Sequence, residues 1–252
     1  MEALDDLTII ISAFVDSEKR KDNIRRCVEY LTHHFDVDIL ICEQDTESKL
    51  SDIPGTQHVF IHQPEMFRKQ ISYNVGAKHA KTKAIGLYDA DIILHPKQIS
   101  KSAQLICDDK FDIVYPYDGK FYDVPEKYHE DITKSKSVSC IDIEECTLFN
   151  PNSIGGAVFY NRNVFLEGGG GNENFIGVGY EDDELAHRFP KLGYTVARID
   201  QPLFHLTHPR KETSWNHNPE TQHNQEEYSR IVSMPVEQLR EEIKTWPGYV
   251  KN

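Results

Sequence analysis

Apolar runs alternate with segments of helical periodicity along the first part of the chain. Continuous apolar, β-branched runs at residues 7–15, 37–42, 58–62 and 84–94 predict strands that are buried on both faces. Between these runs, apolar residues recur at helical spacing from Ile24 to Leu31 and again over residues 71–84. Strands that alternate with helices in this way indicate an α/β fold, with a mostly parallel central sheet flanked by helices.

The second part of the chain has a less regular pattern. Residues 112–117, 154–160 and 194–199 predict further strands, and the segment that begins at Glu181 has the apolar spacing of a short helix. One or two helices are predicted from Glu226 onward. Residues 116–150 show scattered charge and little periodicity, so we expect this segment to be irregular.

The chain of 252 residues is long enough for a single large domain. We divide this domain into a nucleotide-binding half over residues 1–95, a second half over residues 96–215, and a helical C-terminal extension over residues 216–252. In open α/β sheets, ligands bind beyond the carboxyl ends of the strands, so we expect the functional site at that edge.

Four consecutive glycines, residues 168–171, stand ahead of four consecutive carboxylates, residues 181–184. Glycine loses more backbone entropy than other residues in regular structure, so the run predicts a mobile loop. The carboxylates suit the N-terminus of the following helix, which explains them without any function. Alternatively, they form a carboxylate cluster beside a flexible lid, as expected of an enzyme that deprotonates a hydroxyl group once its donor is covered.

Composition and charge limit the classes of partner and the cellular location that we expect for this protein. A net charge of −13 disfavours nucleic acid or an anionic membrane surface as the main partner. The five cysteines are odd in number and lack metal-site spacing, so we expect mostly reduced thiols in a cytoplasmic protein. No basic leader precedes the first apolar run, and no run of about 18 apolar residues predicts a transmembrane segment. We expect a protein that is free in the cytoplasm or held by a partner at the inner face of a membrane.

Two groups of polar residues have the chemistry of metal ligands. Asp89 and Asp91 flank Ala90 near the end of a predicted strand, and such hard oxygen ligands suit Mn²⁺ or Mg²⁺ beside a diphosphate. Aspartate is also common in solvated turns, which is the simpler explanation. His205 and His208 follow a strand-like segment and can complete a metal site that carboxylates begin. They can equally be surface histidines of a histidine-rich segment that includes His217.

Two further segments have a possible binding role. The adjacent Gly155 and Gly156 open a predicted strand, which indicates either close approach of the backbone to a ligand or a bend. The segment Phe67-Arg68-Lys69, followed by Asn74, offers an aromatic ring and two cations at the start of a helix. It suits a stacked base and a phosphate, although a solvated helix start explains it too.

Taken together, these segments resemble glycosyltransferases of the GT-A fold. More narrowly, they resemble the beta-1,4-galactosyltransferase and chondroitin-polymerase-like families over roughly residues 7–215. The order and spacing of five motifs carry the resemblance: the first strand with Arg20 and Asn23, Phe67-Arg68 through Asn74-Val75-Gly76, Asp89-Ala90-Asp91, Gly155-Gly156, and residues 174–183, which are similar to Phe-x-Gly-Trp-Gly-x-Glu-Asp-Asp.

The resemblance implies a metal-dependent, inverting transfer of a sugar from a UDP-sugar to a carbohydrate acceptor. Asp182 is implied as the general base, with Glu181, Asp183, Gly155 and Gly156 at the donor sugar and acceptor. Asp91, Asp89, His205 and His208 are implied as ligands of Mn²⁺ or Mg²⁺. The implied nucleotide-binding residues are Ala13, Phe14, Arg20, Asp45, Phe67, Arg68, Asn74 and Asp89. Residues 96–215 then form the acceptor and catalytic half.

One residue departs from the family pattern. Val178 stands where these families usually carry a tryptophan that lines the sugar sites, so the resemblance favours galactose or N-acetylgalactosamine without fixing the donor. A sugar nucleotidyltransferase is a rival, but the glycine-rich basic loop expected after its first strand is missing from residues 12–21. A binding module without turnover is a second rival, against which the intact carboxylates of both motifs argue.

Overall fold

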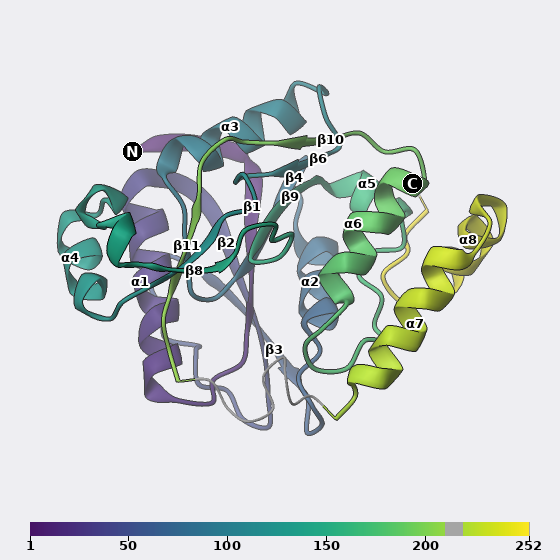
Figure 1. Cartoon of the computed structure of the whole chain (residues 1–252), viewed down its shortest axis with the longest axis horizontal. Coiled ribbons are helices and arrows are strands. Elements are labelled where there is room, and N and C mark those ends of the chain that lie inside the picture. The colour runs from purple at the N-terminus through teal and green to yellow at the C-terminus, as the bar shows by residue number, and fades with distance from the viewer. Residues whose placement is uncertain (210–218, 252) are drawn as a thin grey trace.

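A seven-stranded sheet forms the centre of the protein (Figure 1). The computed structural model describes residues 1–209 and 219–251. In spatial order the strands are β10 (Val196–Arg198), β6 (Ile113–Tyr115), β9 (Ala157–Asn161), β4 (Ala84–Asp89), β1 (Glu2–Ala13), β2 (Phe35–Asp45) and β3 (Gln57–His62). Strand β9 runs antiparallel to both its neighbours, and the other pairs are parallel. The predicted α/β class with a mostly parallel sheet is confirmed.

The apolar runs of the sequence form the buried centre of this sheet. All residues of β1 from Leu7 to Ala13 are buried, because helices cover both faces. In Figure 1, α1 (Glu18–His34) and α3 (Pro96–Cys107) lie on one side, while α2 (Lys69–His79), α5 (Arg162–Glu167) and α6 (Glu181–Lys191) lie on the other.

The C-terminal helices form an outer layer against α6. They are α7 (Thr221–Ser233), α8 (Val236–Glu242) and the short η4 (Ile243–Thr245). Their apolar residues Ile231, Leu239 and Ile243 are buried together with Trp246. The boundaries that we drew at residues 95 and 215 stay predictions, and residues 210–218 lie outside the described residues, His217 among them.

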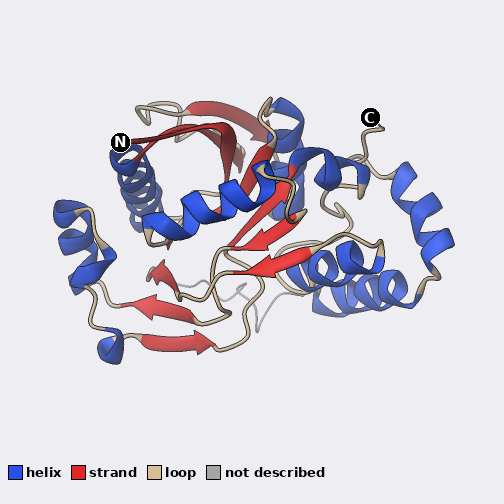
Figure 2. Cartoon of the chain, turned by 90° about the horizontal axis from the view of Figure 1, so that it is seen from above, coloured by secondary structure: helices blue, strands red, loops and turns tan. Residues whose placement is uncertain are grey.

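Residues 116–150 are ordered into regular elements, so the expectation of an irregular segment is wrong. A second sheet has the strand order β5 (Ile92–Ile93), β11 (Leu203–Leu206), β7 (Phe121–Val124) and β8 (Thr147–Asn150). Beside it lie α4 (Lys127–Ser135), η1 (Val138–Cys140) and η2 (Ile143–Glu145) (Figure 2). These elements are too short for their periodicity to stand out in the sequence.

The apolar run at residues 84–94 is divided between the two sheets. Strand β4 ends at Asp89 in the large sheet, and β5 starts at Ile92 in the small one. Ser12 near the end of β1 is paired with Asp89 at the end of β4. The turn at residues 89–91 therefore stands at the carboxyl edge of the large sheet, where ligands of α/β proteins bind.

Candidate active site

A buried cluster of one carboxylate and two imidazoles lies at this edge. Asp91 Oδ2 is 3.1 Å from His208 Nε2 and 3.5 Å from His205 Nε2. Strand β11 carries His205 and pairs with β5, which brings it beside Asp91 although the two are far apart in the sequence. Among the described residues, Asp91, His205 and His208 are the group whose donor atoms lie together as metal ligands do, all within 4.8 Å of one another.

Neighbouring charges hold this cluster in place. Arg20 Nη2 is 3.6 Å from Asp91 Oδ2, and Asp123 Oδ1 is 2.7 Å from His205 Nδ1. Burial by itself lowers the pKa of His205, but the charge of Asp91 and the hydrogen bond with Asp123 raise it to about 9. Burial opposes ionisation of Asp91, yet the His205, His208 and Arg20 groups hold the pKa of Asp91 well below its usual range. Asp123 orients the His205 ring so that Nε2 points toward Asp91.

The cluster has the chemistry of a divalent metal site. Asp91 Oδ2 is buried and makes no hydrogen bond of ordinary geometry to a described residue, although two imidazole nitrogens face it. A cation among these three atoms would satisfy all of them, and carboxylate with imidazole is a ligand set for divalent first-row transition metals, Mn²⁺ among them. The carboxylate behind His205 is the partner that a metal-binding histidine usually has on its other nitrogen. Asp89 is not part of the cluster: its Oδ1 accepts a hydrogen bond from Tyr73.

A second group of charges surrounds Asp182 at the start of α6. Both oxygens of Asp182 accept hydrogen bonds of 2.9 Å from Lys69 Nζ. Lys69 also lies 3.6 Å from Glu181 Oε1 and 3.8 Å from Asp89 Oδ1. One ammonium group therefore connects Asp182 with the motif that contains Asp91.

Burial makes Asp182 a stronger base than an ordinary aspartate. Burial and the charges of Glu181 and Asp89 raise the pKa of Asp182, Lys69 lowers it, and the result is about 7. A general base works best when its pKa lies near the working pH. Gly155 lies directly against this carboxylate, because a Cβ atom there would be 2.2 Å from Asp182 Oδ2. Asp183, the next residue of α6, is exposed.

Several predicted nucleotide-binding residues gather at the ends of β1 and β2. The rings of Phe14 and Phe67 are stacked, with centroids 5.8 Å apart. Ala13 is buried at the end of β1. Asp45 ends β2 and accepts hydrogen bonds from Lys49 and Thr46. Arg68 contacts Glu65 and the carbonyl of Glu173. The nucleotide contacts of these residues stay predictions.

The profile of glycosyl transferase family 2 matches residues 8–168, which is more than half of the chain. The chain belongs to glycosyl transferase family 2. The profile of the N-terminal domain of galactosyltransferase also matches, over residues 137–212, which include α6 and both histidines. No curated protein sequence matches the chain significantly.

Solved structures of similar fold include a galactosyltransferase. The catalytic domain of Drosophila beta1,4galactosyltransferase 7, determined with xylobiose, aligns with a TM-score of 0.53 at 17% identity and covers 91% of this chain and 80% of its own. A mutant of that enzyme with manganese, UDP-Gal and xylobiose gives 0.54 at 17% and the same coverage. A mycobacterial protein gives 0.54 at 15%, over 82% of this chain and 69% of its own. The fold of this family 2 glycosyltransferase is therefore GT-A.

The glycine run of the transferase is buried and closely packed, so the predicted flexible lid is wrong for residues 168–171. All four glycines are buried. A Cβ atom would lie 2.4 Å from the Phe189 ring at Gly168 and 2.1 Å from Gln70 Oε1 at Gly171. Gly170 has a φ of +65°, which favours glycine. The glycines allow side chains of helices α2 and α6 to pack closely against the run, which is therefore part of the core and not a hinge.

Two predicted binding residues of the transferase make structural contacts, and one of them, Gly156, also lines a small pocket with Gly155 and Asp182. Asn74 is buried, and its amide exchanges hydrogen bonds with the backbone of Gly171, at 2.7 and 2.8 Å. We therefore assign Asn74 to the packing of the glycine run and not to nucleotide contact. Gly156 has a φ of +85° and faces Leu203 and Phe121, so it permits a turn in the core. Its carbonyl accepts a hydrogen bond from Asp89 N–H.

Sequence reasoning missed the residues that support the site. Lys69 was expected at a phosphate, whereas the transferase pairs it with Asp182. Asp123 lies on β7, a strand of four residues that is too short to show a periodic pattern in the sequence. Arg188 is completely buried on α6, although an arginine in a helix with four carboxylates at its start is typical of surface charge.

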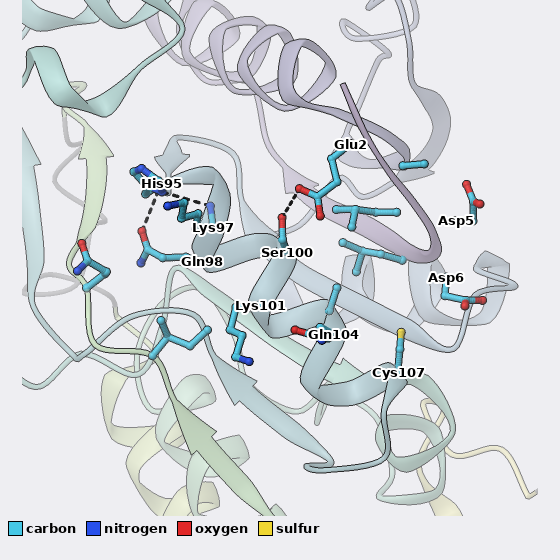
Figure 3. Close-up of a pocket in the computed structure, with 16 residues that line it drawn as sticks. Glu2, Asp5, Asp6, His95, Lys97, Gln98, Ser100, Lys101, Gln104 and Cys107 are labelled. Carbon is cyan, nitrogen blue, oxygen red and sulfur yellow. Dashed lines mark hydrogen bonds between the residues drawn. The ribbon is translucent and has the colours of Figure 1, made fainter.

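A separate hollow lies away from these residues. It is formed between the N-terminal part of β1 and α3, where Ser100 donates a hydrogen bond to Glu2 (Figure 3). None of its lining residues was predicted for the site, and we assign no role to it.

Within the described residues, none of the helices combines the length and the apolar character needed to cross a bilayer.

Proposed function

We propose that the chain is a metal-dependent, inverting glycosyltransferase that moves a hexose or N-acetylhexosamine from a UDP-sugar to a sugar acceptor. Galactose and N-acetylgalactosamine are the favoured donor sugars. One observation carries the proposal: the Asp91-His205-His208 cluster and the Asp182 carboxylate are joined at one sheet edge through Asp89 and Lys69. The similar fold of a Drosophila galactosyltransferase that was determined with manganese and UDP-Gal supports the choice of donor.

Asp91, His205 and His208 would hold Mn²⁺, or Mg²⁺ in its place. A bound divalent cation supplies charge that neutralises a diphosphate and, as a Lewis acid, assists its departure. The chain itself supplies the orientation of this site, because Asp123 fixes the His205 ring and Arg20 stands beside Asp91. The stacked Phe14 and Phe67 offer aromatic surface for a nucleotide base.

Asp182 would take the proton from the acceptor hydroxyl group. Its pKa near 7 leaves it able both to stay ionised at neutral pH and to accept a proton. Lys69 holds the carboxylate through both oxygens and so fixes its direction. Glu181 and Asp183 would orient the donor sugar and the acceptor. An acceptor oxygen that attacks from the face opposite the leaving diphosphate inverts the anomeric carbon.

A donor panel tests the proposal. The full chain is incubated with single UDP-hexoses and UDP-N-acetylhexosamines, simple glycosides and Mn²⁺, and release of UDP is followed. We expect turnover with UDP-galactose or UDP-N-acetylgalactosamine, and little turnover in the presence of a chelator. UDP binding without transfer from any donor would support a binding module instead, and neither binding nor transfer would refute the proposal.

Replacement of Asp91 by alanine should weaken Mn²⁺-dependent UDP binding by about 100-fold or more, since even groups that only support a metal ligand affect affinity by 10–100-fold. Asp123→Asn should give an intermediate loss, because it only orients His205. Isothermal calorimetry with UDP, with and without Mn²⁺, measures both. An unchanged Mn²⁺ dependence in Asp91→Ala would remove Asp91 from the metal site.

The transfer rate should rise with pH and level off above about 7. The pKa of Asp182 is raised, so the carboxylate is protonated, and unable to act as a base, over a wider acidic range than an ordinary aspartate. The ionised fraction, and with it the rate, therefore increases as pH passes through about 7. Values of kcat over pH 5 to about 9, at saturating metal and donor, measure this. A rate that is flat from pH 5 upward would show a base of ordinary pKa.

A further inference from the structure

The side chain of Asn224, on α7, binds the backbone a few residues before the carboxylates that begin α6. Its side chain is completely buried. The Nδ2 group donates a hydrogen bond of 2.9 Å to the carbonyl of Ile176, and the Oδ1 atom accepts one of 3.0 Å from the N–H of Ile176. An amide side chain that bonds both backbone groups of one residue fixes the place and the orientation of that residue. Ile176 lies five residues before Glu181, where α6 begins.

Glu227, one turn further along α7, holds the same segment by a second contact. Its Oε1 atom accepts hydrogen bonds from Asn172 Nδ2 at 2.7 Å and from Asn174 Nδ2 at 3.1 Å. Arg230 donates to both oxygens of Glu227. Burial opposes ionisation, but these hydrogen bonds outweigh it and lower the pKa of Glu227 to about 2. The contact therefore persists as a charged acceptor across the neutral range.

The backbone between Ile176 and Asp182 needs such support. Gly177 and Gly179 have φ angles of +70° and +122°, and Tyr180 has +68° although it carries a side chain. A left-handed residue other than glycine persists where its surroundings fix it. The Tyr180 ring packs against Tyr228 of α7, with centroids 5.6 Å apart. Helix α7 thus holds the turn at both of its ends.

We propose that Asn224 is a positioning residue for sugar transfer: by fixing Ile176, it sets the place of Asp182 relative to the acceptor. The inference rests on the proposed function. Helix α7 lies beyond the segments that match the two family profiles, residues 8–168 and 137–212. The metal cluster is built from β11, the residues directly after it and the turn after β4 instead. The metal ligands and the alignment of Asp182 therefore depend on different elements.

The test is Asn224→Ala in the full chain, with steady-state kinetics and UDP calorimetry in the presence of Mn²⁺. We expect kcat to fall by about tenfold or more, because a displacement of about 1 Å at a reacting group can cost 100-fold. The KM for the UDP-sugar and the Kd for UDP should change much less than kcat, since the metal ligands lie on other elements. A variant that is merely less stable binds UDP at a lower stoichiometry, so kcat is expressed per UDP-binding site, and its loss then disappears.

Asn161→Ala is the matched control. Asn161 caps α5 by accepting hydrogen bonds from the N–H groups of Asn163 and Val164, so the same two-bond loss occurs away from the turn. We expect unchanged kcat in this variant. Hydrogen exchange gives a readout without any ligand: residues 172–180 should exchange faster in Asn224→Ala than in the wild type, and at the wild-type rate in Asn161→Ala.

Glu227→Gln provides a second variant if Asn224→Ala does not fold. It keeps the size of the side chain, removes the charge that binds Asn172 and Asn174, and should show the same split between kcat and KM. An unchanged kcat in the folded Asn224→Ala or Glu227→Gln protein, or a parallel loss of kcat and UDP affinity, would overturn the inference. If the wild-type protein transfers sugar and a variant gives one of these two results, only this inference is refuted. If the wild-type protein transfers no sugar, the proposed function is refuted as well.

Discussion

Replacement of Asp182 with asparagine should lower the rate of sugar transfer by about 100-fold to 10,000-fold, the range that general base catalysis contributes. Asparagine has nearly the same shape but cannot take a proton from the acceptor hydroxyl group. UDP and Mn²⁺ binding should remain, because the metal cluster is formed by Asp91, His205 and His208. The measurement is kcat from UDP release, together with calorimetric UDP binding of the same preparation.

Asp200→Asn serves as the control for Asp182→Asn, since Asp200 is exposed in the turn after β10. It should transfer sugar at the wild-type rate. If Asp182→Asn retains a rate close to the wild type, the base lies elsewhere. If it loses UDP binding together with transfer, the carboxylate supports the nucleotide site and does not act on the acceptor.

Replacement of Arg188 with methionine should lower the free energy of unfolding by about 3–5 kcal/mol, the cost of removing one partner from a buried ion pair. Arg188 is completely buried and forms hydrogen bonds with Glu184 and with the carbonyls of Gly168 and Gly170. Its guanidinium also lies over the rings of Phe189 and Trp246. Methionine fills much of the volume, but it leaves the Glu184 charge and two carbonyls buried without their partner.

Urea denaturation of matched variants measures this cost. Arg25→Met removes an exposed pair with Asp22 and Asp52 and should change stability by less than about 1 kcal/mol. The double variant Glu184→Leu, Arg188→Met should be more stable than Arg188→Met, because both charges are then gone. A single Arg188→Met variant that is as stable as Arg25→Met would show that the buried pair contributes nothing.

The long strands of the large sheet could be predicted from the sequence because each carries its own signal. The run from Leu7 to Ala13 is apolar and β-branched, and it is buried on both faces in β1. The small sheet could not be predicted this way. Strands β7 and β8 have four residues each and pair with segments distant in sequence, so they show no repeating pattern of their own.

The glycine run shows why composition alone misjudged mobility. Glycine permits flexibility, but it equally permits backbones to approach closely, and the two cases differ only in what packs against it. At Gly168 and Gly170 the decisive neighbours are Phe189 and Asn74, which come from separate helices. Only the folded arrangement brings these neighbours together, so the sequence of the run itself carries no sign of them.

The sequence predicted which residue types would form the site, but it did not predict the long-range contacts that join and support them. The motif at residues 89–91 and the spacing of His205 and His208 have the residue types of a metal site, and the sequence displays them directly. The link through Lys69 depends on α2 facing α6 across the sheet edge, and the support from Asp123 depends on β7 pairing with β11. Both are long-range contacts that no local pattern encodes.

The most direct test of the account is the stereochemistry and the stoichiometry of the reaction, followed by proton NMR. The wild-type protein is mixed with UDP-galactose or UDP-N-acetylgalactosamine, Mn²⁺ and a glycoside acceptor. We predict that UDP and a new β-linked sugar accumulate in equal amounts, because a base on the face opposite the diphosphate inverts the α-linked donor. An α-linked product, or hydrolysis to free sugar without transfer, would contradict the account.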